Sequence, residues 1–255
     1  MTREVMKLNK LDLQNHLNEK YSIKILNCID KGFSGDIKYE IILSSRIKGV
    51  LRVNDIKFYN EKLKEFATVK LAFNQGVKCC EPLIVDKNDK LAISFIILTY
   101  IDGQSAENII EDLPENIQYQ IGCQAGKQLR LLHTIAGPRR FDWASYRLSL
   151  YNKYYDMYKK RGIEYEYESK IDCFVKENLY LIKGARPKLC HGDYHVGNII
   201  IKDEKINGII DFKGFGYRDA IEDFYKMAVF SRRKSIPFCC GQVDGYNDGC
   251  PSAEF

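Results

Sequence analysis

The stretch 189–212 carries the residues whose types and spacing are best suited to chemistry. Asp193 is followed five positions later by Asn198, and a second carboxylate, Asp211, stands at the end of the stretch. Two short apolar runs lie on either side of the polar turn 202–207, a pattern that predicts a β-hairpin. Such a hairpin would bring Asp211 back beside Asp193 and Asn198.

Two carboxylates and an amide at one point suit phosphoryl transfer. One carboxylate takes the proton of an attacking hydroxyl, while an amide oxygen and a second carboxylate hold Mg²⁺ on the nucleotide phosphates. We therefore predict that Asp193 is catalytic and that Asn198 and Asp211 are metal ligands. Either half of this pattern alone is equally typical of an ordinary surface hairpin. The two halves together, in this order, favour the catalytic interpretation.

The stretch also resembles known families. The spacing of Asp193 and Asn198 matches the protein-kinase catalytic loop, and Asp211 lies where those enzymes have a metal-binding Asp-Phe-Gly. The form HGDxHxGN over residues 191–198 resembles the aminoglycoside phosphotransferase family, which shares the protein-kinase-like fold with choline and fructosamine kinases. The similarity runs over about 25–230.

This resemblance implies an α+β, bilobal protein-kinase-like fold. The expected N-lobe, residues 1–98, is an antiparallel sheet of about five strands with one helix. A hinge over 99–104 leads to a mainly helical C-lobe, 105–255, which contains the catalytic hairpin. The chain itself supports this division, because five β-type runs lie in its first part, at 21–29, 37–43, 47–53, 82–85 and 91–99.

A turn between the first two predicted strands is expected to cover the nucleotide phosphates. It contains Gly32, Phe33, Ser34 and Gly35. Glycines in such a turn let backbone N–H groups approach a polyanion closely. Most turns of this kind are merely turns, so the downstream catalytic pattern is what favours the phosphate role.

Arg52, on the third predicted strand, stands where the resemblance places a phosphate-binding lysine. Arginine keeps the charge but is not a neutral replacement. Its expected partner is Glu65, on a helix predicted over 58–73. The alternatives are an edge-strand arginine facing water and a glutamate on a solvated helix face.

The resemblance implies further roles for residues outside the catalytic set. Backbone groups of Thr99, Tyr100 and Ile101 would meet the adenine or guanine edge. His191 and Asp223 would support the catalytic loop, Asp223 by hydrogen bonds.

Beyond the hinge the pattern becomes helical, with a core helix over 117–134 and a Tyr- and acid-rich region over 141–178. In the family, the second region helps to bind the acceptor, and interleaved carboxylates and aromatics would suit a polycationic sugar. A solvated amphipathic helix is the alternative. We predict no clear element after Ser235, and we expect a shortened or truncated member because relatives carry further helices there.

Composition limits the class of protein. The 255 residues have a formal net charge of +5, which argues weakly for an anionic ligand and hardly for nucleic acid. No stretch reaches 18 apolar residues and the start has no apolar signal region, so we expect no membrane contact and a cytoplasmic location. A monomer is favoured.

We therefore expect a kinase that uses ATP or GTP with Mg²⁺ to phosphorylate a small hydroxylated substrate, for example an aminoglycoside. The alternatives are a metabolite kinase of the choline or sugar type and a nucleotide-binding pseudoenzyme. A protein kinase is disfavoured because only eight positions separate Asp211 from Asp219, too few for an activation segment. Lys213 replaces the usual glycine of Asp-Phe-Gly, and its effect on the metal is left open.

Overall fold

The computed structural model describes residues 9–30 and 35–252. Its first part is a five-stranded antiparallel sheet with strand order β1-β2-β3-β5-β4. The strands are β1 (Lys24–Cys28), β2 (Ile37–Ile42), β3 (Lys48–Asp55), β4 (Pro82–Asn88) and β5 (Ile93–Thr99). Strand β3 lies in the middle of the sheet, so Arg52 is not an edge-strand residue.

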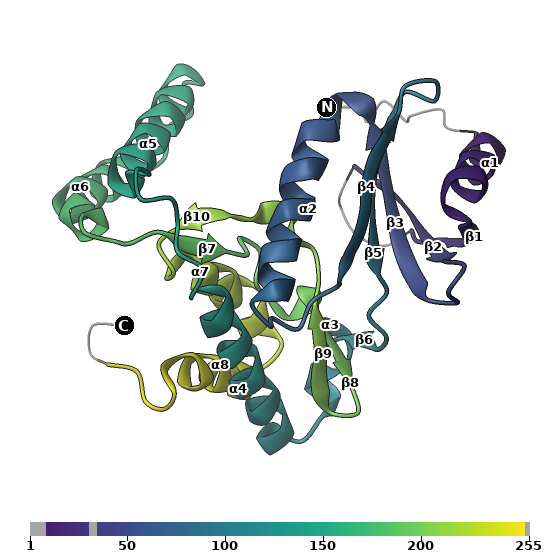
Figure 1. Ribbon diagram of the computed structural model, residues 1–255. Coiled ribbons are helices and arrows are strands. Elements are labelled where there is room, and N and C mark those ends of the chain that lie inside the picture. The colour runs from purple at the N-terminus through teal and green to yellow at the C-terminus, as the bar shows by residue number, and fades with distance from the viewer. Residues whose placement is uncertain (1–8, 31–34, 253–255) are drawn as a thin grey trace.

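Two helices cover opposite faces of this sheet (Figure 1). Helix α1 (Lys10–Tyr21) belongs to one apolar cluster with Phe95 and Ile97, whereas α2 (Tyr59–Asn74) belongs to another with Ile96. The division follows from the period of two in a strand, which sends alternate side chains to opposite faces. The N-lobe thus has a second helix beyond the one expected: the N-terminal segment, which has a loosely helical pattern over 2–20, buries Leu13 and Leu17 against the sheet.

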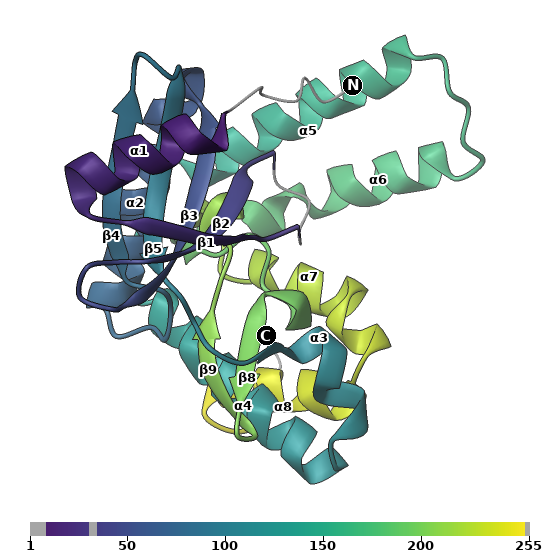
Figure 2. The ribbon, with the colours of Figure 1, turned by 90° about the vertical axis from the view of Figure 1, so that its right-hand side faces the viewer.

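The remaining chain is mainly helical (Figure 2). Its helices are α3 (Ala106–Ile109), α4 (Glu115–Leu132), α5 (Trp143–Lys160), α6 (Glu168–Asn178), α7 (Glu222–Val229) and α8 (Ile236–Asn247). Its short strands are β6 (Gln104–Ser105), β7 (Lys188–Cys190), β8 (Ile199–Lys202), β9 (Lys205–Ile209) and β10 (Gly216–Arg218). Strands β8 and β9 form the predicted hairpin, with Ile199 opposite Ile209.

Single 3-10 turns connect several of these elements. They are η1 (Ile56–Phe58), η2 (Ile110–Asp112), η3 (Leu179–Ile182), η4 (Val196–Asn198), η5 (Phe212–Gly214) and η6 (Ser231–Arg233). Turn η4 contains Asn198 and turn η5 follows directly after Asp211, so both predicted metal ligands lie at tight turns rather than in regular strands.

Helix α8 contradicts the expectation that no element follows Ser235. It packs along α4 (Figure 1), and glycines on both helices face one another. They are Gly122 and Gly126 on α4, and Gly241 and Gly245 on α8. A Cβ atom at any of these four positions would lie 2.1 Å from a backbone carbonyl oxygen of the facing helix. Low helix propensity hid α8 in the sequence, whereas the absence of side chains is what permits this close packing.

Helices α5 and α6 form an arm that projects from the body in both views (Figures 1 and 2). Arg147 at its base lies 3.2 Å from Glu222 of α7. Two of its carboxylates are held within the arm: Asp172 accepts from Tyr151 at 2.7 Å, and Glu168 accepts from Lys159 at 2.7 Å. Lys176 and Lys159 partly neutralise Asp172 and Glu168, respectively. Among the described residues, none of the helices combines the length and apolar character needed to span a membrane.

Candidate active site

The predicted catalytic loop, residues 191–198, follows β7 and folds back on itself around Asp193. The side-chain nitrogen of Asn198 donates to the Asp193 carbonyl oxygen at 2.8 Å and to Asp193 Oδ2 at 3.0 Å. These bonds fix the two predicted residues in contact. With its amide nitrogen engaged in this way, Asn198 has its amide oxygen directed elsewhere, as a metal ligand requires.

The β8–β9 hairpin brings Asp211 back next to Asn198. Ile210 donates its N–H to the Asn198 carbonyl oxygen at 3.0 Å, and Asp211 follows with left-handed backbone angles (φ 64°, ψ 60°). Asp211 Oδ1 is buried and has no hydrogen-bond partner within the part of the chain that the structure describes. A buried carboxylate oxygen without a donor is costly unless a cation compensates it, and here Arg52 Nη1, 3.8 Å from Oδ1, compensates it in part. Carboxylate and amide oxygens are the ligands that Mg²⁺ prefers, so the residues fit this metal.

His191 links the catalytic loop to the strand that leads to Asp211. Its Nδ1 accepts from the Asp193 N–H at 3.2 Å, and its Nε2 donates to the Ile210 carbonyl oxygen at 3.0 Å. Complete burial lowers the pKa of His191, which agrees with the neutral ring that these two bonds require. The ring also packs on Phe212, with the ring centroids 4.7 Å apart.

Asp223, at the start of α7, supports the catalytic loop by accepting hydrogen bonds from its backbone. It is fully buried, and it accepts from the backbone N–H groups of His191 at 2.8 Å and Gly192 at 2.6 Å. His133 Nε2 donates to it at 3.0 Å, while the other ring nitrogen of His133 meets Tyr246 of α8. Burial alone would raise the pKa of Asp223, but the hydrogen bonds from His133 and from the Gly192 N–H lower it.

The backbone conformation and the close contact at position 192 explain why the loop has glycine between the histidine and the aspartate. Its φ is +80°, and a Cβ atom there would lie 2.0 Å from the carbonyl oxygen of Gly214. A side chain would therefore separate the catalytic loop from the turn after Asp211. Lys213, which replaces the usual glycine of Asp-Phe-Gly, lies in that turn, and its Nζ is 3.6 Å from Asp36 Oδ1.

Arg52 is buried between two carboxylates. Its Nη1 lies 2.5 Å from Glu65 Oε1, so the structure places together the pair that the spacing favoured. Its Nε and Nη2 both donate to Asp36 Oδ2, at 2.9 and 2.7 Å, and Nη1 is 3.8 Å from Asp211 Oδ1. Burial opposes the charge, but Glu65 and Asp36 raise the pKa of Arg52, so the guanidinium stays charged.

Asp36 and Lys62 complete this buried cluster, and sequence reasoning missed both. Lys62 Nζ lies 2.7 Å from Asp36 Oδ2 and 3.5 Å from Glu65 Oε2. Burial would raise the pKa of Asp36, but Arg52 and Lys62 hold it far below its usual range. A signal for Lys62 was available, because it lies one helical turn before Glu65 and on the same face as buried Val69.

The structure does not describe all of the predicted nucleotide contacts. Gly32, Phe33 and Ser34 lie outside the described residues, while Gly35 is exposed beside them with open space around its Cα. Their role as a phosphate cover stays a prediction.

The hinge residues are partly committed to the sheet. Thr99 N–H donates to the Glu81 carbonyl oxygen, and Tyr100 N–H donates to the Lys48 carbonyl oxygen, at 2.9 and 3.0 Å. Any contact of these two residues with a nucleotide base would therefore use other atoms. Ile101 packs its side chain against Gly208 of the catalytic hairpin. The hinge assignment itself stays a prediction.

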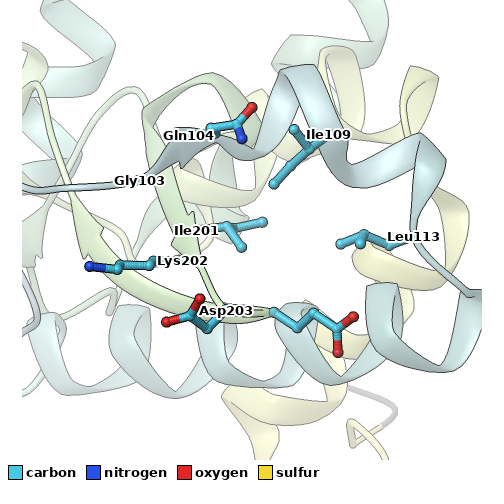
Figure 3. A pocket seen from close by; sticks show the side chains of 8 residues that line it. Gly103, Gln104, Ile109, Leu113, Ile201, Lys202 and Asp203 are labelled. Carbon is cyan, nitrogen blue, oxygen red and sulfur yellow. The ribbon is translucent and has the colours of Figure 1, made fainter.

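A surface pocket of about 300 Å³ lies at the turn end of the hairpin (Figure 3), whereas the predicted catalytic residues lie at its mouth. Its walls are Gly103, Gln104, Ile109, Leu113, Ile201, Lys202, Asp203 and Glu204. None of the predicted catalytic or metal-binding side chains contributes to it. We do not assign this pocket to the reaction.

The fold and the site define a phosphotransferase with the protein-kinase-like architecture. The chain belongs to the phosphotransferase enzyme family, whose model matches residues 27–254. The family resemblance and the α+β fold expected from the sequence are thereby confirmed. No curated protein sequence gives a significant match.

Solved structures of similar fold include three aminoglycoside phosphotransferases. The GDP complex of aminoglycoside 2'-phosphotransferase-IIIa has a TM-score of 0.72 at 15% identity, with 94% of this chain and 83% of that chain covered. The ADP-bound APH(2'')-Ib has a TM-score of 0.70 at 18% identity, and the gentamicin complex of APH(2")-IIa has 0.69 at 19%. Each of these two comparisons covers 94% of this chain and 82% of the other. At these identities the likeness shows the fold alone.

Proposed function

We propose that this protein transfers the γ-phosphoryl group of ATP or GTP to a hydroxyl group of a small molecule. One observation carries the proposal: Asp193, Asn198 and Asp211 converge, and Asp211 Oδ1 is buried without a hydrogen-bond donor among the described side chains. A surface hairpin of purely structural function has no need of that costly arrangement.

The roles follow from the geometry and from the chemistry of phosphoryl transfer. Asp193 would orient the acceptor hydroxyl and take its proton, because Asn198 fixes its carboxylate. Asn198 and Asp211 would hold Mg²⁺, which supplies charge neutralisation on the nucleotide phosphates when bound. Arg52 would add a fixed positive charge next to Asp211. Since the transition state is loose, positioning and charge account for most of the rate.

We place the acceptor among hydroxylated antibiotics such as aminoglycosides. Similar folds have been solved as gentamicin and kanamycin complexes, and the α5–α6 arm carries carboxylates among aromatic rings, which suits a polycation. A metabolite alcohol of the choline or sugar type is the alternative acceptor. A panel of both compound classes, assayed with ATP and with GTP, separates these substrates.

Asp193→Asn tests the mechanism. The substitution keeps the shape of the side chain but removes the charge that draws off the proton, so turnover should fall by roughly 10²–10⁴-fold. Nucleotide affinity should change little, since a loss confined to the chemical step identifies a group that acts in the transition state. Asp203→Asn is the matched control, because Asp203 is an exposed aspartate at the far end of the same hairpin. Undiminished turnover by Asp193→Asn would overturn the mechanism.

The engagement of Arg52 by two carboxylates favours a second candidate, a nucleotide-binding protein without turnover. A guanidinium already bound by Asp36 and Glu65 has fewer N–H groups to offer a phosphate. In that case the unaltered chain would bind nucleotide with Mg²⁺ but phosphorylate no member of the panel. Asp193→Asn would then leave every measured property unchanged.

A further inference from the structure

Helix α7 and the turn after it follow the catalytic loop almost residue by residue. Asp223 accepts from the first two N–H groups of the loop, as described above. Further along, Phe230 packs on His195 with the ring centroids 5.1 Å apart, and Ser231 Oγ accepts from the Val196 N–H at 3.2 Å. Between these contacts lie Tyr194, whose hydroxyl donates to the Ala125 carbonyl oxygen of α4, and Asp193, whose side chain faces α7.

Lys226 is the α7 residue that contacts the Asp193 side chain. It lies one helical turn after Asp223 and therefore on the same face of α7. Its Nζ is 3.3 Å from Asp193 Oδ1, and it also lies 5.2 Å from the centroid of the Phe230 ring. The Lys226 side chain is 31% exposed, so it reaches the loop from the solvent side of the site.

Asp193 is thus held through both carboxylate oxygens. Oδ2 accepts from the Asn198 amide at 3.0 Å and lies 3.6 Å from His195 Nε2, while Oδ1 faces Lys226. Asn198 contributes no net charge and the partner on Oδ1 is a full cation. Lys226 therefore supplies the positive charge paired with this carboxylate.

The charge matters because of what Asp193 must do. A carboxylate that receives the proton of an acceptor hydroxyl must stand near the γ-phosphoryl group, which is itself strongly negative. The negative charges of the carboxylate and the γ-phosphoryl group repel one another. A nucleoside diphosphate has no γ-phosphoryl group, and its terminal β-phosphate lies farther from the carboxylate. The repulsion therefore weakens binding of a triphosphate more than binding of a diphosphate. A cation paired with the carboxylate offsets this repulsion.

We propose that Lys226 is a positioning residue that makes Asp193 compatible with a bound nucleoside triphosphate. It holds the carboxylate in place and neutralises it toward the γ-phosphate, so it favours the triphosphate over the diphosphate. The inference rests on the proposed function, because it takes Asp193 as the group that faces the acceptor.

The test compares two nucleotides on one protein. Lys226→Met keeps the length and apolar stem of the side chain and removes its charge. We expect affinity for a non-hydrolysable ATP analogue with Mg²⁺ to fall about three- to fivefold, the upper part of the range for one partly exposed ion pair. Affinity for ADP with Mg²⁺ should stay within about twofold. Lys226→Arg should restore the ATP-analogue affinity, since it restores the charge.

Lys234→Met is the matched control. Lys234 follows α7 in the same lobe, has a similar exposure of 35%, and pairs with Glu111 at 2.6 Å rather than with the catalytic loop. It should bind both nucleotides as the unaltered chain does. Thermal melting of all variants checks the fold, and Lys226→Gln replaces the Met variant if that one is unstable.

The outcomes separate this inference from the proposed function. If the unaltered chain binds neither nucleotide, the proposed function fails, and the role of Lys226 fails with it. If it binds both and Lys226→Met weakens both equally, or neither, the proposed function stands and the role of Lys226 is refuted. A loss limited to the triphosphate, restored by arginine, supports the inference.

Discussion

Asp223→Asn is the substitution whose effect the structure defines most closely. Both carboxylate oxygens of Asp223 accept hydrogen bonds in a fully buried site. Two of these hydrogen bonds come from backbone N–H groups of the catalytic loop. Asparagine keeps one oxygen but places an NH₂ group where the second oxygen was. One backbone N–H of His191 or Gly192 then faces another donor instead of an acceptor.

The expected cost can be estimated from these contacts. A buried donor left without a partner costs about 1–3 kcal/mol, and the hydrogen bond from His133 to Asp223 is weakened as well. We expect the free energy of unfolding to fall by about 3 kcal/mol. For a chain of this length that lowers Tm by roughly 6–12 °C. Turnover should also fall, because the loop that carries Asp193 loses its support.

Calorimetric melting measures the stability change, with Asp156→Asn as the control because Asp156 is exposed on α5. A loss below about 1 kcal/mol, or one no larger than that of the control, would refute the view that Asp223 braces the loop.

The stability difference between the unaltered chain and Asp223→Asn should also depend on pH. The pKa of Asp223 is lowered in the folded chain from an ordinary value of 3.8, so its contribution is complete above that value. As the pH falls through the lower, folded-state pKa, the carboxylate is protonated and the contribution is lost. The two proteins should therefore differ most near neutral pH and converge in acid. A difference that grows as the pH falls would contradict this assignment.

Three further predictions follow from the site and the helix packing. Asp211→Ala should weaken nucleotide binding and abolish its dependence on Mg²⁺, as measured by calorimetric titration with and without EDTA; equal affinity of the unaltered chain in EDTA would remove the metal role. Arg52→Lys should lower Tm, because one ammonium cannot replace the three guanidinium nitrogens bonded to Asp36 and Glu65, and unchanged melting would show that the cluster contributes little. Gly245→Leu should unfold or strongly destabilise the chain, since even a Cβ there would lie 2.1 Å from a carbonyl oxygen of α4, and an unaltered circular-dichroism melt would rule out this packing.

The sequence by itself determined the features that depend on local order. The spacing of Asp193 and Asn198, the two apolar runs and Asp211 lie within one short stretch, so a single hairpin brings them together without help from distant segments. The strands of the N-lobe sheet were predictable for a similar reason, because β-branched residues and turn residues alternate along the chain. The roles of these site residues, and the lobe boundary at 99–104, stay predictions.

The tertiary structure decided everything that joins distant segments. The glycines of α8 favour a helix only because α4 offers glycines opposite them, more than a hundred positions earlier. Asp36 and Lys62 look like ordinary surface charges until the sheet and α2 enclose them together with Arg52. Lys226 is one of many lysines in the sequence, and it is singled out only because α7 packs along the catalytic loop. Long-range packing of this kind has no signature in local periodicity, since a contact depends on both partners while a sequence pattern reports on one.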